Sequence, residues 1–215
     1  EKNSNFENIY GPKKTLEIVK ILIKKTISRQ LKYIYRTHNK NTHSINQIPT
    51  GLHKKINNLK PDIVNFHWLG NEMISIKEIS KINAKIVWTL HDMWPFCGAE
   101  HYTKNQRFIE GYNKFNRPND ESGFDLNRYV WKKKKKYFKN VNNFICTSNW
   151  MFERAKKSKL LQNKNIEKIP LTLDKNFWKP LDIKFCKNFF EIREDEKVIL
   201  FGADNFLKNA RKGFD

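Results

Sequence analysis

The sequence predicts an α/β fold in which a parallel sheet is flanked by helices. Short apolar segments rich in β-branched residues alternate along the chain with longer segments of helical spacing, the pattern of strands joined by crossover helices. Of the 215 residues, 39% are hydrophobic and 13% are aromatic, which excludes a disordered basic chain. No apolar run reaches the roughly 18 residues that a membrane-spanning helix needs.

Five segments are expected to form strands, because each is short, apolar and bounded by polar residues or turn formers. In chain order these strands are residues 62–66, 85–90, 142–146, 165–169 and 197–201. Helices are expected between the strands, at residues 72–82, 128–139 and 150–161. Residues 37–61 are polar and contain Pro49, Gly51 and Pro61, so we expect a loop there.

Residues 12–36 are predicted to form a basic amphipathic helix. Pro12 suits a first helical position, and apolar residues from Leu16 to Ile34 recur at steps of three and four. Lysines and arginines are interspersed among them. Two interpretations stay open: a surface helix packed on its own domain, or a helix lying on an anionic membrane surface.

The chain is strongly basic, with 42 Lys and Arg against 22 Asp and Glu and a formal net charge of +20. One explanation is a general richness in lysine, which informs about solubility and not about fold. The other is clustering, and the five consecutive lysines Lys132–Lys136 beside Trp131 form such a cluster. This run indicates either a solvated helix face or a surface for acidic partners. Because no nucleic-acid-binding motif accompanies the run, we expect no nucleic-acid partner.

Cysteine usage and the chain ends indicate the cellular context. Cys97, Cys146 and Cys186 form no C-x-x-C pair, which argues against a disulfide scaffold and fits a reducing compartment. No secretory signal pattern opens the sequence, so we expect a cytoplasmic protein. The sequence starts at Glu1 and stops shortly after the strand expected at 197–201, so we also expect a piece of a longer protein.

The candidate functional residues follow the predicted strands, because parallel α/β sheets bind ligands at the carboxyl ends of their strands. They are His67, Trp68, His91, Asp92, Trp94, Glu100, His101, Ser148, Asn149 and Gly202. Aromatic faces beside fixed polar groups suit a polyhydroxylated ligand such as a sugar.

Alternative chemistries are poorly supported. His91 and His101 lack the i, i+4 spacing of a helical zinc pair, and no phosphate-binding loop, dinucleotide fingerprint or nucleophile elbow is present. We therefore expect no metal and no bound cofactor. A histidine at a strand end can also be structural, and Ser148 can simply cap the helix that follows it.

Residues 88–102 read Trp-Thr-Leu-His-Asp-Met-Trp-Pro-Phe-Cys-Gly-Ala-Glu-His-Tyr. This segment resembles the signature of the group 1, family-4 glycosyltransferases of bacterial cell-surface polysaccharide synthesis. The flanks agree with the resemblance at residues 61–68, 116–118 and 123–128, and matching residues continue in the family's order to residues 211–213. The resemblance covers residues 43–215.

The resemblance implies a GT-B enzyme, in which two Rossmann-like domains face a cleft. Residues 1–180 would be the N-terminal acceptor-side domain, and residues 181–215 the linker and first strand of the nucleotide-sugar-binding domain. The enzyme would retain anomeric configuration and use a nucleotide-sugar as co-substrate without a metal. Two departures occur: Leu171 where members often have Asn, and Ala203 where related enzymes have Arg.

The resemblance also implies residue roles. His91 falls on the family's acceptor-domain histidine near the transferred sugar, and Lys212 falls on its diphosphate-binding lysine, with Gly202 on the donor side. The implied function is transfer of a sugar to a growing surface glycan or a lipid-linked acceptor at the inner face of the plasma membrane. We expect this chain to be inactive alone. The alternative is a non-catalytic basic module that binds nucleic acid or anionic membrane.

Overall fold

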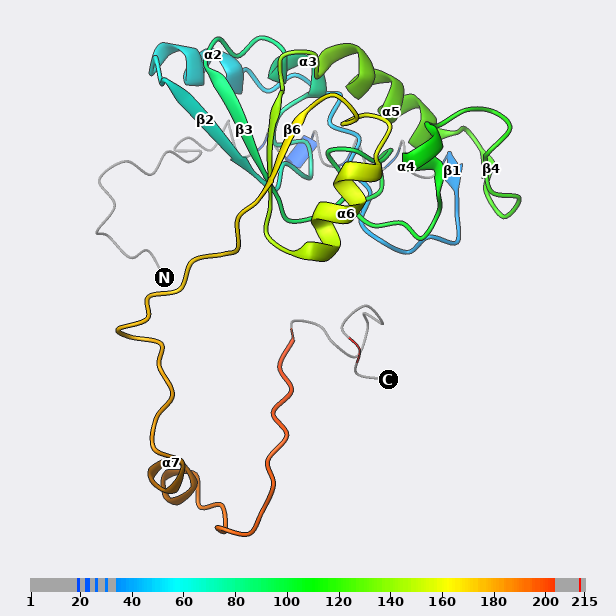
Figure 1. Cartoon of the computed structure of the whole chain (residues 1–215). Coiled ribbons are helices and arrows are strands. Elements are labelled where there is room, and N and C mark those ends of the chain that lie inside the picture. The colour runs from blue at the N-terminus through cyan, green and yellow to red at the C-terminus, as the bar shows by residue number, and fades with distance from the viewer. Residues whose placement is uncertain are drawn as a thin grey trace. The chain divides into compact units, whose positions relative to one another are not determined.

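The computed structural model describes residues 34–203 together with Val19, Leu22, Ile23, Thr26, Gln30 and Gly213 (Figure 1). The chain divides into two units, Glu1–Leu171 and Thr172–Asp215. The assignment of residues 1–180 to an acceptor domain and of 181–215 to the start of a donor domain stays a prediction. None of the described helices is long and apolar enough to cross a membrane.

A four-stranded parallel sheet forms the centre of the first unit, which confirms the predicted α/β class. The strand order is β2-β3-β5-β6. The bounds are β2 (Ile63–His67), β3 (Lys85–Leu90), β5 (Asn143–Cys146) and β6 (Asn165–Lys168), so four of the five predicted strands are confirmed within one residue at each end.

The helices of the first unit are α2 (Leu52–Asn58), α3 (Ile76–Ile79), α4 (Arg107–Glu110), α5 (Leu126–Tyr137) and α6 (Asn149–Lys157). Helices α2, α3 and α5 form a row along one side of the unit, and α6 packs on β5 and β6 (Figure 1). Helix α2 lies in the stretch for which a loop was predicted. The breakers flank it, because Gly51, with φ of 79°, is its N-cap and Pro61 follows its end.

The helix predicted at residues 72–82 is much shorter in the structure, where only α3 is helical. Asn71 and Glu72 have positive φ angles of 53° and 61°, which no helix can include. The Glu72 carboxylate accepts hydrogen bonds from the backbone N–H groups of Asn46 and Gln47. Helix α3 therefore begins later, at a capping box formed by Ser75 and Glu78.

The chain near residue 36 also differs from the prediction. Most of the helix predicted at 12–36 lies outside the described residues, but β1 (Tyr35–Arg36) is a strand paired antiparallel with β4 (Ser122–Gly123). Gly123, with φ of 68°, is required there, since a Cβ would lie 2.3 Å from the Ile34 carbonyl oxygen. Tyr35 and Arg36 therefore belong to a strand and not to the end of the predicted helix.

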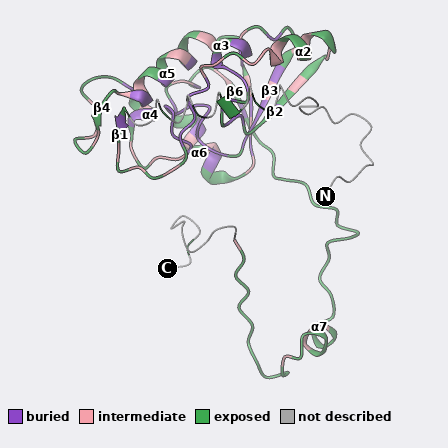
Figure 2. Ribbon diagram, turned by 180° about the vertical axis from the view of Figure 1, so that it is seen from behind, coloured by how far each residue is buried: buried purple, intermediate pink, exposed green. Residues whose placement is uncertain are grey.

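The buried parts of the described chain belong to the first unit (Figure 2), and an aromatic cluster of its core centres on Trp88 of β3. The rings of Phe66, Trp94, Phe138 and Phe144 all lie with centroids 5.3–6.4 Å from that of Trp88. Contacts of this kind add about 0.5–1.5 kcal/mol each beyond area burial. The core therefore fixes β3, and with it the loop that follows this strand.

The second unit contains helix α7 (Ile183–Phe189), capped by the Asp182 carboxylate. The strand predicted at residues 197–201 is absent from this described segment, so that prediction is wrong for the structure. Ile199 and Leu200 are 95% and 93% exposed, and no neighbouring strand offers hydrogen-bonding groups. An apolar segment cannot form a stable strand without a partner strand and a face to bury.

Candidate functional site

Two histidines meet at the carboxyl end of the parallel sheet. His67 is the last residue of β2, and His91 directly follows β3, its hydrogen-bonded neighbour. Nδ1 of His67 and Nε2 of His91 lie 2.9 Å apart, so one imidazole donates a hydrogen bond to the other. Both residues are exposed. The structure therefore brings together two predicted site residues and leaves them accessible to a ligand.

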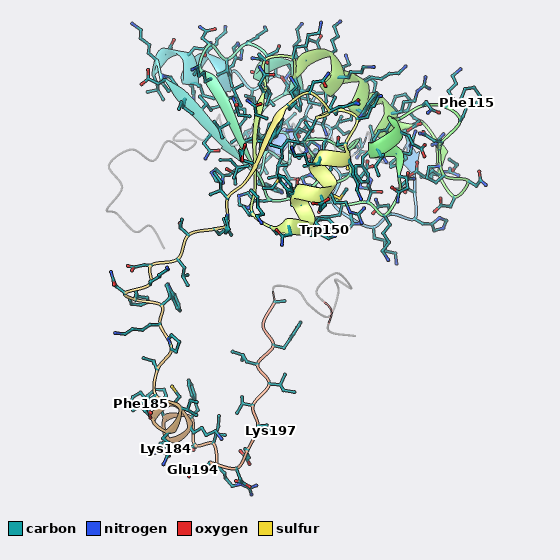
Figure 3. The ribbon with its side chains drawn as sticks, in the orientation of Figure 1. Phe115, Trp150, Lys184, Phe185, Glu194 and Lys197 are labelled. Atoms are coloured by element: carbon teal, nitrogen blue, oxygen red, sulfur yellow. The ribbon has the colours of Figure 1, made fainter. Side chains whose placement is uncertain are left out.

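Aromatic side chains surround this histidine pair. The Tyr102 hydroxyl donates to the His91 carbonyl oxygen at 2.9 Å, and the Tyr102 ring lies 6.3 Å from that of Trp150 at the start of α6. Trp150 projects from the surface with 47% of its area exposed (Figure 3). Trp68, next to His67, has a left-handed backbone (φ 41°) and is 39% exposed. Exposed aromatic faces of this kind can stack on the apolar face of a sugar ring.

Ser148 and Asn149, after β5, have protein partners. The Ser148 side chain caps α6 by accepting a hydrogen bond from the Met151 N–H at 3.2 Å, so the capping interpretation is confirmed. Asn149 Oδ1 accepts a hydrogen bond from Lys168 Nζ at 2.8 Å. A direct ligand contact by either residue stays a prediction.

Asp92 and His101 lie beneath the surface and bind each other. His101 Nδ1 is 2.5 Å from Asp92 Oδ2, and its Nε2 is 2.8 Å from Ser44 Oγ. All three residues are at most 6% exposed. The geometry is that of a Ser-His-Asp triad, but a hydroxyl this buried is inaccessible to a substrate. The arrangement therefore holds the loop in place, because both imidazole nitrogens are satisfied.

Trp94 is likewise buried, between His101 and the aromatic core. Its indole Nε1 donates to the Ser44 carbonyl oxygen at 2.8 Å, and its ring stacks on His101 with centroids 6.2 Å apart. Asp92, Trp94 and His101 were predicted to line the cleft. The structure instead buries them beneath the surface, where their polar atoms bind protein partners and support the loop after β3.

Glu100, another predicted cleft residue, is 2% exposed and accepts a hydrogen bond from the Tyr112 hydroxyl. Burial raises the pKa of Glu100 to about 7, although the bond from Tyr112 opposes this shift. Burial also raises the pKa of Tyr112. Glu100 thus lies in the interior and is placed away from direct contact with a ligand at the surface.

Lys134 is a central supporting residue that the sequence did not reveal. It belongs to the run Lys132–Lys136, for which either a solvated helix face or a surface for acidic partners was predicted, yet it is fully buried. Its Nζ donates to the carbonyl oxygens of Trp94, Cys97 and Gly98, and it lies 3.8 Å from the centre of the Trp94 ring. Burial lowers the pKa of Lys134 to about 7. This ammonium therefore ties the loop after β3 to α5.

The spacing of residues along α5 could have indicated that Lys134 is buried. Leu126, Val130, Lys134 and Phe138 follow one another at steps of four, and all four are buried. The loop approaches this stripe closely, since a Cβ on Gly98 would lie 2.6 Å from the backbone of Asn127. A lysine in a buried stripe must find acceptors, and the three carbonyls supply them.

The donor-side residues cannot be placed in this site. Gly202 belongs to the second unit, and Lys212 lies outside the described residues. Among the residues that the structure describes, no group of three or more His, Cys, Asp or Glu side chains could hold a metal ion. The roles of Gly202 and Lys212 in donor binding stay predictions.

The chain is thus an α/β protein with an exposed histidine pair at the carboxyl edge of a parallel sheet, the edge at which folds of this class bind their ligands. The family model described as Glycosyltransferase Family 4 matches residues 24–177. The chain belongs to this family, and its fold is that expected for the Rossmann-like N-terminal domain of a GT-B glycosyltransferase with sugar donor and acceptor substrates. Neither a curated protein nor a solved structure matches the chain.

Proposed function

We propose that the chain is the acceptor-side part of a retaining glycosyltransferase that moves a sugar from a nucleotide-sugar to a glycan or lipid-linked acceptor. The observation that carries this proposal is the pair of exposed imidazoles, His67 and His91, at the carboxyl edge of the sheet of a family-4 glycosyltransferase. Both are flanked by exposed aromatic rings.

His91 is the proposed catalytic residue, in contact with the transferred sugar. If Nδ1 of His67 donates to Nε2 of His91, the neutral His91 ring carries its own proton on Nδ1. Among the described residues no group forms a hydrogen bond with that nitrogen, so it can donate to a sugar oxygen. The bond from Tyr102 to the His91 carbonyl fixes the backbone. A donor positioned in advance is most effective where charge develops in the transition state.

On the donor side we propose that Lys212 neutralises the leaving diphosphate and that Gly202 permits close approach of the backbone. A cation beside the diphosphate offsets developing negative charge, so no metal ion is needed in this scheme. The nucleotide-sugar is then the co-substrate, and Trp68 and Trp150 form stacking surfaces for the acceptor.

We further propose that residues 12–36 hold the enzyme at the cytoplasmic face of the membrane, near lipid-linked acceptors of surface polysaccharide. Val19, Leu22 and Ile23 are 44–56% exposed, which supports an apolar face free for lipid. Each Lys or Arg near an anionic surface contributes about 1 kcal/mol. Vesicle co-sedimentation should weaken with salt and on replacing Lys20, Lys24 and Arg29 by Glu, whereas equal binding to neutral and anionic vesicles would contradict this placement.

The decisive test is His91→Ala in the enzyme expressed from its complete reading frame. Turnover should fall at least about 100-fold, the scale for loss of a positioned polar group in a closed site. His38→Ala is the matched control, because the His38 side chain is exposed and lies outside the site. Near-normal transfer by a folded His91→Ala enzyme would overturn the role of His91. NMR of the anomeric product should show retention.

The 215-residue chain by itself should bind nucleotide-sugars weakly. Residues 197–201 form no strand, and a Cβ built on Gly202 would meet no atom within 4 Å, so the described residues form no preorganised pocket around Gly202. A single solvated lysine–phosphate contact contributes about 1 kcal/mol or less, far below the roughly 8 kcal/mol of micromolar binding. Calorimetry with UDP-, GDP- and ADP-sugars tests this, and micromolar binding of any of them would place the donor site in the first unit.

A further inference from the structure

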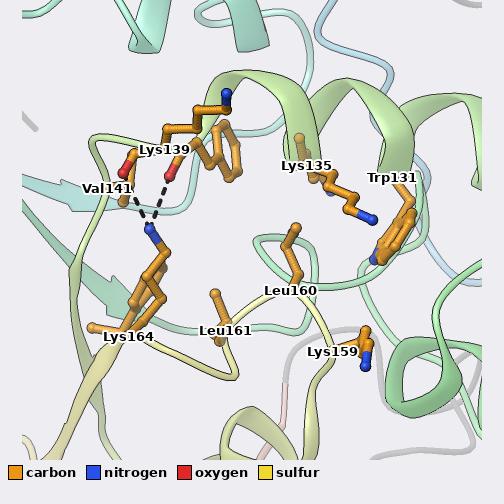
Figure 4. A pocket seen from close by; sticks show the side chains of 11 residues that line it. Trp131, Lys135, Lys139, Val141, Lys159, Leu160, Leu161 and Lys164 are labelled. Carbon is orange, nitrogen blue, oxygen red and sulfur yellow. Dashed lines mark hydrogen bonds between the residues drawn. The ribbon is translucent and has the colours of Figure 1, made fainter.

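A pocket of about 170 Å³ lies between α5 and the segment that joins α6 to β6 (Figure 4). Trp131 and Lys135 of α5 and Phe138 at its C-terminal cap line one side of the pocket, and Lys159, Leu160 and Leu161 line the other side. Val141 and Lys164, which also line it, lie two residues before β5 and one residue before β6. The pocket is therefore at the amino ends of these strands, at the opposite edge of the sheet from His67 and His91.

Every charged side chain of the pocket is a lysine. Five lysines line it, namely Lys134, Lys135, Lys139, Lys159 and Lys164. Lys134 and Lys164 are used internally, the latter through bonds to the Phe138 and Lys139 carbonyls and to Asn142. Lys135, Lys139 and Lys159 are exposed, and no carboxylate among the described residues forms an ion pair with them. The pocket therefore has a strongly positive rim.

The indole N–H of Trp131 is a buried donor without an acceptor. Trp131 is 6% exposed, and its Nε1 has no hydrogen-bond partner. Lys135 Nζ lies 5.5 Å from the centre of the Trp131 ring, and Figure 4 shows the Lys135 and Trp131 side chains beside each other, next to Leu160. A buried polar group without a partner costs about 1–3 kcal/mol, so a donor left open beside ammonium groups favours an acceptor from a ligand.

The rest of the lining is apolar, and its size limits the ligand. Phe138, Val141, Phe144, Leu160 and Leu161 supply this surface. A cavity of roughly 150 Å³ accommodates benzene, so this pocket can take one apolar group of about six carbons. A ligand that fits this pocket therefore carries both an anionic group that accepts hydrogen bonds and an apolar group.

We propose that this pocket binds a small amphipathic phosphate: the phosphate is held by Lys135, Lys159 and the Trp131 indole N–H, and the apolar group packs on Leu160 and Leu161. Three terminal phosphate oxygens can each accept from one of these three donors. The phosphate can belong to a soluble metabolite or to a lipid headgroup. The inference is independent of the proposed glycosyl transfer, because the two sites share no residue.

The primary test is a titration of the 15N-labelled chain with phenyl phosphate. The indole N–H resonance of Trp131, identified by its absence in Trp131→Phe, should shift on binding, while inorganic phosphate and benzyl alcohol should bind at least about tenfold more weakly, since each lacks one half of the ligand. Binding of inorganic phosphate as tight as that of phenyl phosphate would remove the apolar part of the proposal. An unmoved Trp131 resonance would overturn the site.

Charge-reversed pairs separate a specific site from general attraction to a basic protein. The double variant K135E/K159E should weaken phenyl phosphate binding at least about tenfold. The double variant K132E/K136E changes the net charge equally at exposed positions of the same helix that do not line the pocket, and should leave binding within about twofold. Equal losses in the two variants would overturn the proposal.

Two further arms complete the test. Calorimetry on Trp131→Phe, with thermal melting to verify folding, should show binding weakened about five- to tenfold, and unchanged binding would exclude the indole as a donor. Vesicles containing phosphatidic acid identify the source of the phosphate, with both pairs made in the K20E/K24E/R29E background so that the segment proposed to bind membrane at residues 12–36 does not itself hold the chain on the vesicles. Co-sedimentation lost in K135E/K159E but kept in K132E/K136E assigns a lipid headgroup, and equal co-sedimentation of both variants, with phenyl phosphate binding lost only in the former, assigns a soluble metabolite.

Discussion

The loop after β3 carries one histidine at its start and another near its end, and their surroundings differ sharply. His91 is exposed and its ring shares a hydrogen bond with another imidazole, whereas His101 is buried with both ring nitrogens bonded to protein groups. An imidazole with both nitrogens satisfied has no capacity left for a ligand. Two histidines of one loop therefore have different roles. His91 lies on the surface, where it can contact a ligand, and His101 lies in the interior, where it holds the loop in position.

The largest expected effect is on the interior. Lys134→Ala should lower the free energy of unfolding by about 3 kcal/mol, because three buried carbonyl oxygens lose their donor and the ring of Trp94 loses its cation. Its neighbour Lys135 is exposed, so Lys135→Ala should change stability by less than about 0.5 kcal/mol. Urea denaturation of the two variants measures the contrast, and similar losses would show that Lys134 is not a buried tie.

The two histidines should separate in the same measurement. His101→Ala should cost about 2 kcal/mol, since it leaves the buried Asp92 carboxylate and Ser44 hydroxyl without this partner. His91→Ala should cost less than about 0.5 kcal/mol, because an exposed side chain leaves no buried group unpaired. Thermal melts give the order of the two variants, and a reversed order would break the comparison.

Glu78 provides a pH-dependent probe of the interior. Burial would raise its pKa, but hydrogen bonds from Thr50, Ser75 and His53 prevail and lower it to about 2. Because the folded-state pKa lies below the unfolded one, this stabilisation is complete above about pH 4.5 and is lost as pH falls toward 2. Wild type should lose about 2 kcal/mol over this range that Glu78→Gln does not lose. Parallel slopes in acid denaturation would contradict the assignment.

The smallest effect is expected at the exposed aromatic edge. Trp150→Ala should raise the KM for the acceptor about threefold to tenfold with little change in kcat, because stacking contributes about 1 kcal/mol and is made equally in the ground and transition states. Phe115→Ala is the control, since Phe115 is 98% exposed and lies far from Trp150 on the first unit (Figure 3). A fall in kcat with unchanged KM would show that Trp150 positions the reacting groups instead.

Much of the sheet could be predicted from the sequence, because buried parallel strands leave short apolar runs with clear limits. The prediction failed at residues 197–201, where such a run has no partner strand, and at residues 72–82, where the Glu72 side chain captures the backbone of residues 46–47. Both failures depend on tertiary contacts, which a local pattern does not contain.

For the site, the search at the carboxyl ends of the predicted strands identified His67 and His91, which lie together in the structure. It could not reveal which polar residues of the following loop face inward. Asp92, Glu100 and His101 have the same composition cues as a surface site, and their burial depends on Ser44 and Tyr112, which carried no signal. Lys134 was hidden by its neighbours, because four exposed or partly exposed lysines beside it dominate the local pattern.

The bond between His101 and Ser44 joins residues 57 positions apart in the chain. Closing a loop of this length lowers the entropy of the chain before the contact can stabilise it, so contacts of this kind form late in folding. During synthesis Ser44 leaves the ribosome well before His101 does, and in that interval its partner is missing. The pairing of β3 with β5 closes a loop of nearly the same length, because Val87 and its partner Asn143 are 56 positions apart, and Asn143 leaves the ribosome later still. A nascent chain therefore has the residues that support the loop after β3 before it has those that complete the sheet.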